Sequence, residues 1–477
     1  MKLFMIGWDT NEEFIDVALK LQDQGHEILY WVGVGNDRKY NFEKFKNKVI
    51  FHRFYDAASG IPPTELANTN FTPPGEDLIR QFHETESILS TMKFFEKFLK
   101  STLEKKRLFH YFLEYWLGVL EKFKPDAIIF SLCPHAGFDF VIYSLAKYLK
   151  IKTIMFEYVR AANRLLLIND YKIGSLKLRE EISNNKKYKL EDLSLDIQEY
   201  YKFYARGGGD KVTTPDFKIQ KKKYLGVNLL IIKIKMIINS ILDFSIIKKS
   251  FLFILKRFKS NLKKEYCKLQ VNPDFNNKYI YIALHFQPEL ATSPLGGIFI
   301  DQISMIKILS ASLPKDWFIY VKEHPAQWLP SGLSFSSFRY EGFYKEIAKL
   351  KNVNLVPINT DSIELINNSR LVATVTGSVG WEAAMRLKPV LAFGYPWYRD
   401  CPGVFKVNNV DLCKQVIDSV NSGLKLNEQD IINYLASIDK ISFFGYFMQW
   451  IKEQSKITGA EHSNNFFKAI VCDLNNK

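Results

Sequence analysis

The sequence predicts an α/β protein in which two Rossmann-like domains face a cleft and a basic helical insert lies between them. Three observations support this prediction. Short apolar strands alternate with helical segments in both halves of the chain. A basic, apolar stretch without this alternation separates the halves. The 477 residues, 47% of them apolar and 24% charged, are typical of a folded protein of two or three domains.

The first half opens with a β-α-β unit, the building block of a parallel sheet. Apolar runs predict strands at 2–7 and 27–32, with a helix between them that starts near Glu12 and runs through Leu21. The aromatic-rich segment 86–124 is expected to be helical. It leads into a strand at 127–130, a helix at 138–149 and a strand at 153–156. This order predicts a doubly wound sheet.

The second half shows the same alternation after Asn272-Pro273. Its predicted strands are 279–284, 318–321, 353–356, 371–375 and 390–393. We therefore expect four regions: a Rossmann-like domain at 1–205, a basic helical insert at 206–272, a second Rossmann-like domain at 273–430, and C-terminal helices at 431–477 that pack back on the first domain.

The formal net charge of +14 is concentrated in the insert. Residues 218–264 contain thirteen Lys and Arg against one acid, Asp243. A basic amphipathic helix of this kind suits an anionic membrane surface. The alternative is an apolar helix pair that packs on the first domain with solvated lysines. No nucleic-acid-binding module accompanies the charge, so we expect no nucleic-acid partner.

The five cysteines are scattered, odd in number and without CxxC spacing. This argues against a zinc site and a disulfide framework, and favours a reducing compartment. The first residues have too short an apolar run for a signal peptide, and no uninterrupted apolar stretch is long enough to span a membrane. We therefore expect a cytoplasmic protein, with peripheral attachment to the inner face of the membrane as an option.

The segment Thr376-Gly377-Ser378 follows a predicted strand and opens a helix that carries Glu382. Backbone N–H groups and a hydroxyl at such a turn suit a phosphate group. Glu382, about one turn into the helix, is placed to accept a hydrogen bond from a sugar hydroxyl. The alternative is a capped helix after a core strand.

Two other predicted strands of the second half end in polar residues. Lys322 and His324 follow one strand, and Gln287 and Glu289 follow another. Ligands of open α/β sheets bind at such strand ends. His324 suits an anionic oxygen, and Glu289 suits a nucleophile, a base or a substrate-orienting group. Each is also compatible with a polar surface turn.

Two acids of the first half occupy comparable positions. Asp139 follows the strand at 127–130 by a short loop, and Glu157 follows the strand that ends at Phe156. Either acid could face the other domain and act as a base. Taken singly, each is more typical of a helix cap or a surface group.

The strings HFQPE (285–289), VKEHP (321–325) and TGSVGWEAAMRLKPVLAFGYPWY (376–398) resemble the capsule polysaccharide biosynthesis protein family, which includes retaining β-Kdo transferases. The resemblance covers roughly 279–403. It implies a GT-B glycosyltransferase without a metal or other cofactor, whose donors are CMP-activated ulosonic acids, chiefly CMP-β-Kdo. The first domain would then bind the acceptor and the second the nucleotide sugar.

The resemblance also implies roles for the motif residues. Lys322, His324 and the turn at 376–378 would hold the donor phosphate, Glu382 the ribose, and Gln287 would lie beside the reacting sugar. Kdo-transferring members carry an Asp shortly after this Gln, whereas the nearby acid here is Glu289. Glu289 is then the first candidate for a nucleophile, and Asp139 or Glu157 for the base that activates the acceptor.

These features predict a glycosyltransferase of capsular or lipopolysaccharide synthesis that transfers a CMP-activated ulosonic acid, with retention, to a glycan or lipid-linked acceptor. Two alternatives remain open. One is a GT-B transferase or epimerase that uses a UDP-sugar. The other is a non-catalytic scaffold of a glycan-assembly machine, which would keep the fold and lose donor binding.

Overall fold

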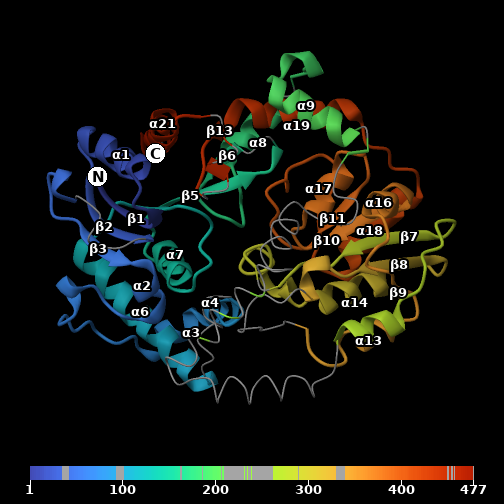
Figure 1. Cartoon of the computed structure of the whole chain (residues 1–477), viewed down its shortest axis with the longest axis horizontal. Helices are drawn as coiled ribbons and strands as arrows, with labels where there is room; N and C mark the ends of the chain where they lie inside the picture. The colour runs from blue at the N-terminus through green and yellow to red at the C-terminus, as the bar shows by residue number, and fades with distance from the viewer. Residues whose placement is uncertain are drawn as a thin grey trace.

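The computed structural model describes residues 1–34, 42–92, 101–161, 164–184, 186–205, 207–208, 230, 234, 238, 262–287, 289–328, 339–447, 451–452, 455 and 457–475. Within these residues the chain forms two α/β domains, each built around its own sheet (Figure 1). The predicted fold class of two Rossmann-like domains is confirmed. Most of the basic stretch 218–264 lies outside the described residues.

The first sheet has seven strands in the order β13-β6-β5-β4-β1-β2-β3. The strands β1 to β5 are parallel, β6 pairs antiparallel with β5, and β13 pairs antiparallel with β6 at the edge of the sheet. Successive residues of β1 alternate between two apolar cores, so that Phe4 lies in one and Met5 in the other. The strands are β1 (Lys2–Asp9), β2 (Glu27–Val34), β3 (Ile50–Arg53), β4 (Ala127–Phe130), β5 (Lys152–Val159), β6 (Arg164–Ile168) and β13 (Phe443–Phe444).

The expected helical segment 86–124 is found in two helices, and residues 93–100 between them lie outside the described residues. A helix ends at Leu89, and a new one begins at Thr102 behind Ser101. Ser101 and Glu104 form a capping box in which Ser101 N donates to Glu104 Oε2 at 2.6 Å. The helices of this domain are α1 (Glu12–Asp23), α2 (Phe54–Ser59), α3 (Glu76–Gln81), α4 (His83–Leu89), α6 (Thr102–Phe123), α7 (Phe138–Tyr148), α8 (Leu176–Ser183) and α9 (Leu195–Ala205).

The second sheet has six parallel strands in the order β12-β11-β10-β7-β8-β9. Read from the other edge, its first strand β7 lies between β8 and β10, which is the strand order of a Rossmann fold. The sequence predicted five of these strands and missed the short edge strand β12. The strands are β7 (Lys278–Ala283), β8 (Trp317–Lys322), β9 (Val353–Leu355), β10 (Leu371–Thr374), β11 (Val390–Ala392) and β12 (Val404–Lys406).

The expected boundary at residue 273 lies too late, because the preceding helix α13 (Leu262–Leu269) is part of the second domain. The buried Tyr266 of α13 donates to Val356 O at 2.5 Å. The carboxylate of Glu265 accepts from the backbone at the start of α15, including Tyr344 N at 3.0 Å. The other helices are α14 (Gln302–Ser312), α15 (Phe343–Ala348), α16 (Ser362–Asn368), α17 (Ser378–Ala384) and α18 (Val410–Asn421).

The C-terminal part of the chain returns to the first domain (Figure 1). The helix α19 (Glu428–Ile441) packs against α8, β13 pairs with β6, and α21 (Gly459–Asn475) packs against α1. One apolar core is shared between the domains, since it contains Ile197 of α9 as well as Tyr281 and Trp381 of the second domain. The two domains therefore meet over an apolar contact that α8, α9 and α19 extend.

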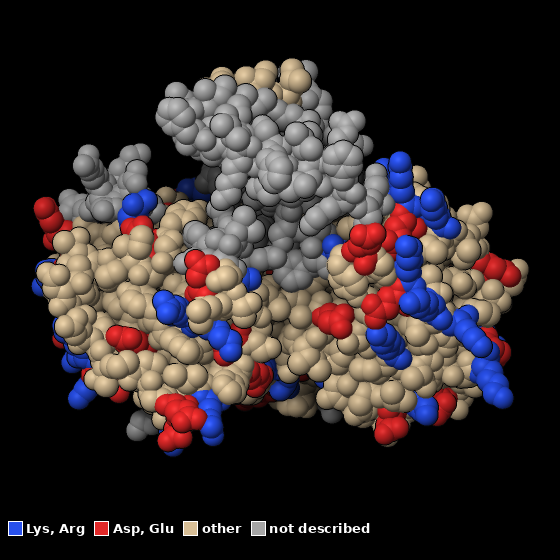
Figure 2. Space-filling model, turned by 90° about the horizontal axis from the view of Figure 1, so that it is seen from below, with Lys and Arg blue, Asp and Glu red and all other residues tan. Residues whose placement is uncertain are grey.

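Charges of both signs are intermixed over the described surface of both domains in the face shown in Figure 2. This agrees with the sequence, in which the positive excess falls almost entirely in 218–264. Among the described residues, no helix is both long enough and apolar enough to cross a membrane.

Candidate active site

The three polar motifs meet at one edge of the second sheet, because β7 lies between β8 and β10. His285, just after β7, joins two of them. Burial lowers the pKa of His285 to about 4, so its ring is neutral at pH 7. Its Nε2 accepts a hydrogen bond from Thr376 N at 3.1 Å. The loops after β7 and β10 are thus connected directly.

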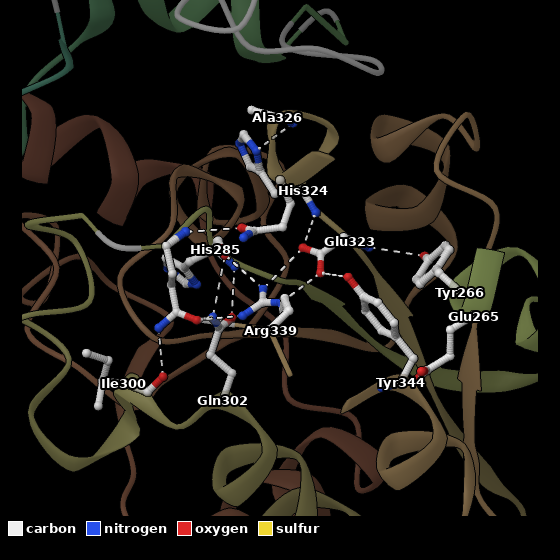
Figure 3. Close-up of polar contacts among 12 residues, drawn as sticks. Glu265, Tyr266, His285, Ile300, Gln302, Glu323, His324, Ala326, Arg339 and Tyr344 are labelled. Carbon is white, nitrogen blue, oxygen red and sulfur yellow. Dashed lines mark hydrogen bonds and ion pairs between the residues drawn. The ribbon is translucent and has the colours of Figure 1, made fainter. Parts of the chain in front are cut away.

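A buried ion pair lies under the loops that follow β7 and β8 (Figure 3). Arg339 and Glu323 have side chains that are 1% and 0% exposed, and Arg339 Nε lies 2.8 Å from Glu323 Oε2. Arg339 Nη2 also donates to His285 O at 3.0 Å. Burial would lower the pKa of the Arg339 guanidinium, but Glu323 and Tyr344 raise it. The arginine therefore stays charged and joins the two loops.

Both polar atoms of the Gln287 side chain form hydrogen bonds within the same network. Its Oε1 accepts from Arg339 Nη1 at 2.6 Å and from Gln302 Nε2 at 2.7 Å. Its Nε2 donates to Ile300 O at 2.8 Å. The side chain is buried and 3% exposed. In this arrangement Gln287 shapes the loop that leads to Glu289, and its amide points away from solvent.

Glu323, the acid of the buried ion pair, fixes the position of the adjacent His324 at the end of β8. The backbone N of His324 donates to Glu323 Oε1 at 2.6 Å. Its Nδ1 accepts from Ala326 N at 3.1 Å, which places the proton of the neutral ring on Nε2. The ring lies 5.8 Å from that of Phe286, centroid to centroid. A half-buried imidazole with a fixed tautomer is suited to donate to an anionic oxygen.

Lys322 lies on the opposite face of β8 from Glu323, as consecutive strand residues do. Its Nζ donates to Thr360 O at 2.7 Å and to Ser362 Oγ at 2.6 Å. Burial lowers the pKa of Lys322 to about 8, and Glu382 opposes this shift. Lys322 and Glu382 are 3% and 5% exposed. The structure thus brings together the two predicted nucleotide-binding side chains that are farthest apart in sequence.

The turn at 376–378 is held from several sides. Thr376 Oγ1 donates to Ala291 O, and Gly377 N donates to Thr374 Oγ1 at 2.9 Å. A Cβ at Gly377 would lie 2.9 Å from Thr374 Oγ1 and 3.2 Å from His285 Nε2, so only glycine fits there without a shift. The helix α17 that follows has seven residues. A phosphate would therefore depend on the Ser378 side chain and nearby cations more than on a helix dipole.

Glu289 is an exposed residue of the loop after Gln287. Its backbone carbonyl accepts from Thr292 N at 3.0 Å and from Ser293 N at 3.1 Å. The Ser293 hydroxyl in turn lies 2.8 Å from Thr91 Oγ1 of the first domain. The loop that carries the predicted nucleophile therefore lies at the contact between the domains.

The two first-domain acids have structural partners. Asp139 is buried and accepts from His135 N at 3.0 Å and Ala136 N at 2.8 Å, which orders the entry to α7. His135 itself lies before the helix. Glu157 forms an ion pair with Arg399 of the second domain. Both carboxylates act here as structural groups, and their catalytic roles stay predictions.

Sequence reasoning missed Arg339, Glu323, His285 and Gln302. Arg339 follows a segment without a predicted helix or strand, and no motif contains it. Glu323 and His285 lie inside the quoted motifs, but the predicted functional groups are their neighbours Lys322, His324 and Gln287. Glu323, between Lys322 and His324, was the available signal for a further cation. A carboxylate that becomes buried at a strand end needs a cationic partner.

Comparison with known proteins bears on the family. Residues 243–422 match the model of a family described as "Capsule polysaccharide biosynthesis protein". This segment is just over a third of the chain and contains all three motifs. No curated protein matches the chain.

Several solved structures resemble the chain at low identity. A β-Kdo 2,7 transferase, KpsC, of Thermosulfurimonas dismutans has 12% identity and a TM-score of 0.29, covering 79% of this chain and 95% of its own. A UDP-GlcNAc 2-epimerase of Neisseria meningitidis, bound to UDP-GlcNAc, has 13% identity, a TM-score of 0.25 and full coverage of both chains. A glycosyltransferase of Rickettsia africae has 11% identity and a TM-score of 0.26, covering 100% of this chain and 99% of its own.

Because these TM-scores are below 0.5, the functions of the three proteins are not transferred to this chain. The family match does not depend on these structures. It covers the end of the second sheet where the three motifs meet. Residues 243–422 thus resemble the capsule polysaccharide biosynthesis protein family, as the motifs indicated.

Proposed function

We propose that this protein is a glycosyltransferase of surface-polysaccharide synthesis that transfers a CMP-activated ulosonic acid, with retention and without a metal, to a glycan or lipid-linked acceptor. The observation that carries the proposal is the convergence of Lys322, His324, Ser378 and Glu382 at the strand ends of the second Rossmann-like sheet. The family of the matched segment supports a role in capsule synthesis.

The donor is an anion, and its leaving group is a phosphate. His324 would donate from Nε2 to a phosphate oxygen, and Lys322 would offset its charge from the other face of β8. Fixed donors aimed at a developing charge are often the largest contribution to catalysis. Glu382, buried next to Lys322, would accept from the ribose hydroxyls.

Retention requires either two successive displacements or a front-face substitution, and Glu289 makes two displacements the first choice. In the first displacement, a Glu289 oxygen would form a bond to the anomeric carbon while the bond from that carbon to the CMP phosphate oxygen breaks. In the second, the acceptor oxygen would replace Glu289 at the same carbon and lose its proton to a base. The exposed position of Glu289, in a loop at the contact between the domains, is compatible with access to both substrates.

The proposal is tested by turnover of the purified protein with a panel of CMP- and UDP-activated sugars. We expect transfer from a CMP-ulosonate with retention, and a large loss of kcat in His324→Ala. His110→Ala, on α6 of the first domain, is the matched control and should keep full activity. Turnover with UDP-sugars alone would favour the UDP-dependent alternative, and no turnover or nucleotide binding would favour a scaffold.

We also propose that the insert docks on an anionic membrane, which would bring the enzyme to a lipid-linked acceptor. Leu230, Ile234 and Ile238 are helical, four residues apart, and 60%, 49% and 49% exposed. Such an apolar row within a basic segment is typical of helices that lie on a membrane. Exposure of these three apolar side chains to water is unfavourable, and a membrane surface would cover them.

Liposome flotation tests the docking. The wild-type protein should float with vesicles that contain anionic lipid and sink with neutral ones. Changing Leu230, Ile234 and Ile238 together to Ser should abolish flotation. The control changes Leu176, Leu195 and Phe203 to Ser, since these are also exposed apolar residues but lie in the first domain. Equal flotation of both triple variants would refute the docking.

A further inference from the structure

We propose that Arg339 is a positioning residue for catalysis, which holds Gln287 and, through Glu323, the catalytic His324. This inference rests on the proposed function and adds to it a residue outside the three motifs. Arg339 does not touch the predicted substrates. It acts by fixing the two loops that carry the groups closest to the reacting sugar and the leaving phosphate.

The contacts of Arg339 span the loops after β7 and β8. One planar guanidinium donates to Glu323 through Nε and Nη2, to Gln287 Oε1 through Nη1, and to His285 O through Nη2. Such a fork of donors in one plane is specific to arginine, because lysine offers a single charged centre. The geometry therefore requires arginine at this position to connect the two loops.

The path from Arg339 to His324 has two steps. Glu323, held by Arg339, also accepts from Tyr344 OH at 2.6 Å. The remaining bond of the same carboxylate is to His324 N, at 2.6 Å. A rotation of the Glu323 carboxylate would therefore move the backbone of His324 and the imidazole with it. Displacements of about 1 Å in a catalytic group can lower rates by about 100-fold.

The Arg339 cluster (Arg339, Glu323, Gln287 and Tyr344) reaches the predicted phosphate site through His324 and does not contact Lys322. Lys322 and Glu323 point to opposite faces of β8, and Lys322 binds Thr360 and Ser362 rather than any member of the Arg339 cluster. Loss of Arg339 should consequently displace His324 but leave Lys322, Ser378 and Glu382 in place, so that kcat falls by more than the affinity for CMP. A residue needed only for folding would not separate these two quantities.

The test compares Arg339→Met, Glu323→Gln and the double variant for kcat, CMP affinity and thermal midpoint. Arg339→Met leaves the Glu323 carboxylate buried without its cation and should lower the midpoint. The double variant removes both charges, which often restores stability. We expect the double variant to regain the midpoint and bind CMP within about threefold of wild type, while its kcat stays at least about 100-fold lower.

Arg339→Lys and Tyr344→Phe keep the series interpretable if the methionine variants do not fold. Arg339→Lys keeps the charge and loses the fork, and Tyr344→Phe removes one bond to Glu323. Both should bind CMP normally and lose kcat, Arg339→Lys by more. Recovery of kcat together with stability in the double variant, or wild-type kcat in Arg339→Lys, would overturn the inference. Absence of turnover in the wild-type protein would instead overturn the proposed function.

Discussion

Nucleotide binding should weaken as the pH rises through about 8, because Lys322 loses its charge there. Burial lowers the pKa of Lys322 to about 8 in the free protein, while Asp361 and Glu382 oppose the shift. A bound phosphate would favour the protonated amine and raise its pKa. Affinity for an anionic nucleotide is then highest below pH 8 and falls above it.

The size of the effect follows from the pKa. With a pKa of about 8, the amine is about 90% protonated at pH 7 and about 10% protonated at pH 9. If only the protonated form binds CMP, the dissociation constant should rise about tenfold between pH 7 and pH 9. The phosphate of CMP, with a second pKa near 6, stays almost fully dianionic over this range.

Calorimetric titration with CMP at pH values from 7 to 9.5 measures this dependence. Lys322→Met should bind CMP more weakly at pH 7 and show no rise in the dissociation constant with pH. Lys388→Met is the matched control, since burial also lowers the pKa of Lys388 but its Nζ donates to Ser369 O, at 3.0 Å, away from the motifs. A flat profile in the wild type, or an unchanged profile in Lys322→Met, would refute the reasoning.

Three further predictions concern stability and the turn. Glu157→Gln should lower the free energy of unfolding by about 3 kcal/mol, since Arg399 would remain buried without its carboxylate; loss of turnover at unchanged stability would instead support Glu157 as the acceptor base. His462, which is fully buried, has its pKa lowered to about 4 by burial. In the unfolded protein this histidine takes up a proton as the pH falls below about 6.5, whereas in the folded protein it does so only near pH 4. The free energy of unfolding of the wild type should therefore fall by about 3 kcal/mol between these pH values. His462→Phe should not show this loss. Denaturant titrations at pH 7 and pH 4 check both variants, and equal acid losses in wild type and His462→Phe would contradict the second. Gly377→Ala should weaken CMP binding in the same calorimetric assay, because the new Cβ would lie 2.9 Å from Thr374 Oγ1; wild-type affinity would show that the turn tolerates the shift.

The sequence was sufficient for the fold because the buried parallel strands are short apolar runs bounded by turns. It was insufficient where contacts between residues distant in sequence determine the strands and the domain boundary. The strands β3, β6, β12 and β13 were missed. The boundary before α13 was placed too late, because the capping of α15 by Glu265 is a contact between residues about 80 positions apart.

The motif residues of the candidate site were predictable from the sequence, whereas the buried residues that hold them in place were not. Lys322, His324 and Glu382 stand in motifs at strand ends, where sheet topology brings them together. Arg339 stands in no motif, and its role arises from contacts with loops that are distant in sequence. Glu157 occupies a strand-end position typical of a catalytic acid, yet the opposing domain supplies Arg399 as its partner. Such pairings depend on how the domains pack, which periodicity does not encode.

The central claim, that the second domain binds a CMP-activated donor, is tested most directly by titrating the protein with CMP and UDP side by side at pH 7. The account predicts one CMP site per chain, weaker binding of UDP, and at least a tenfold loss of CMP affinity in Glu382→Ala, about 1.4 kcal/mol. Tighter binding of UDP than of CMP, or CMP binding that Glu382→Ala leaves unchanged, would contradict it.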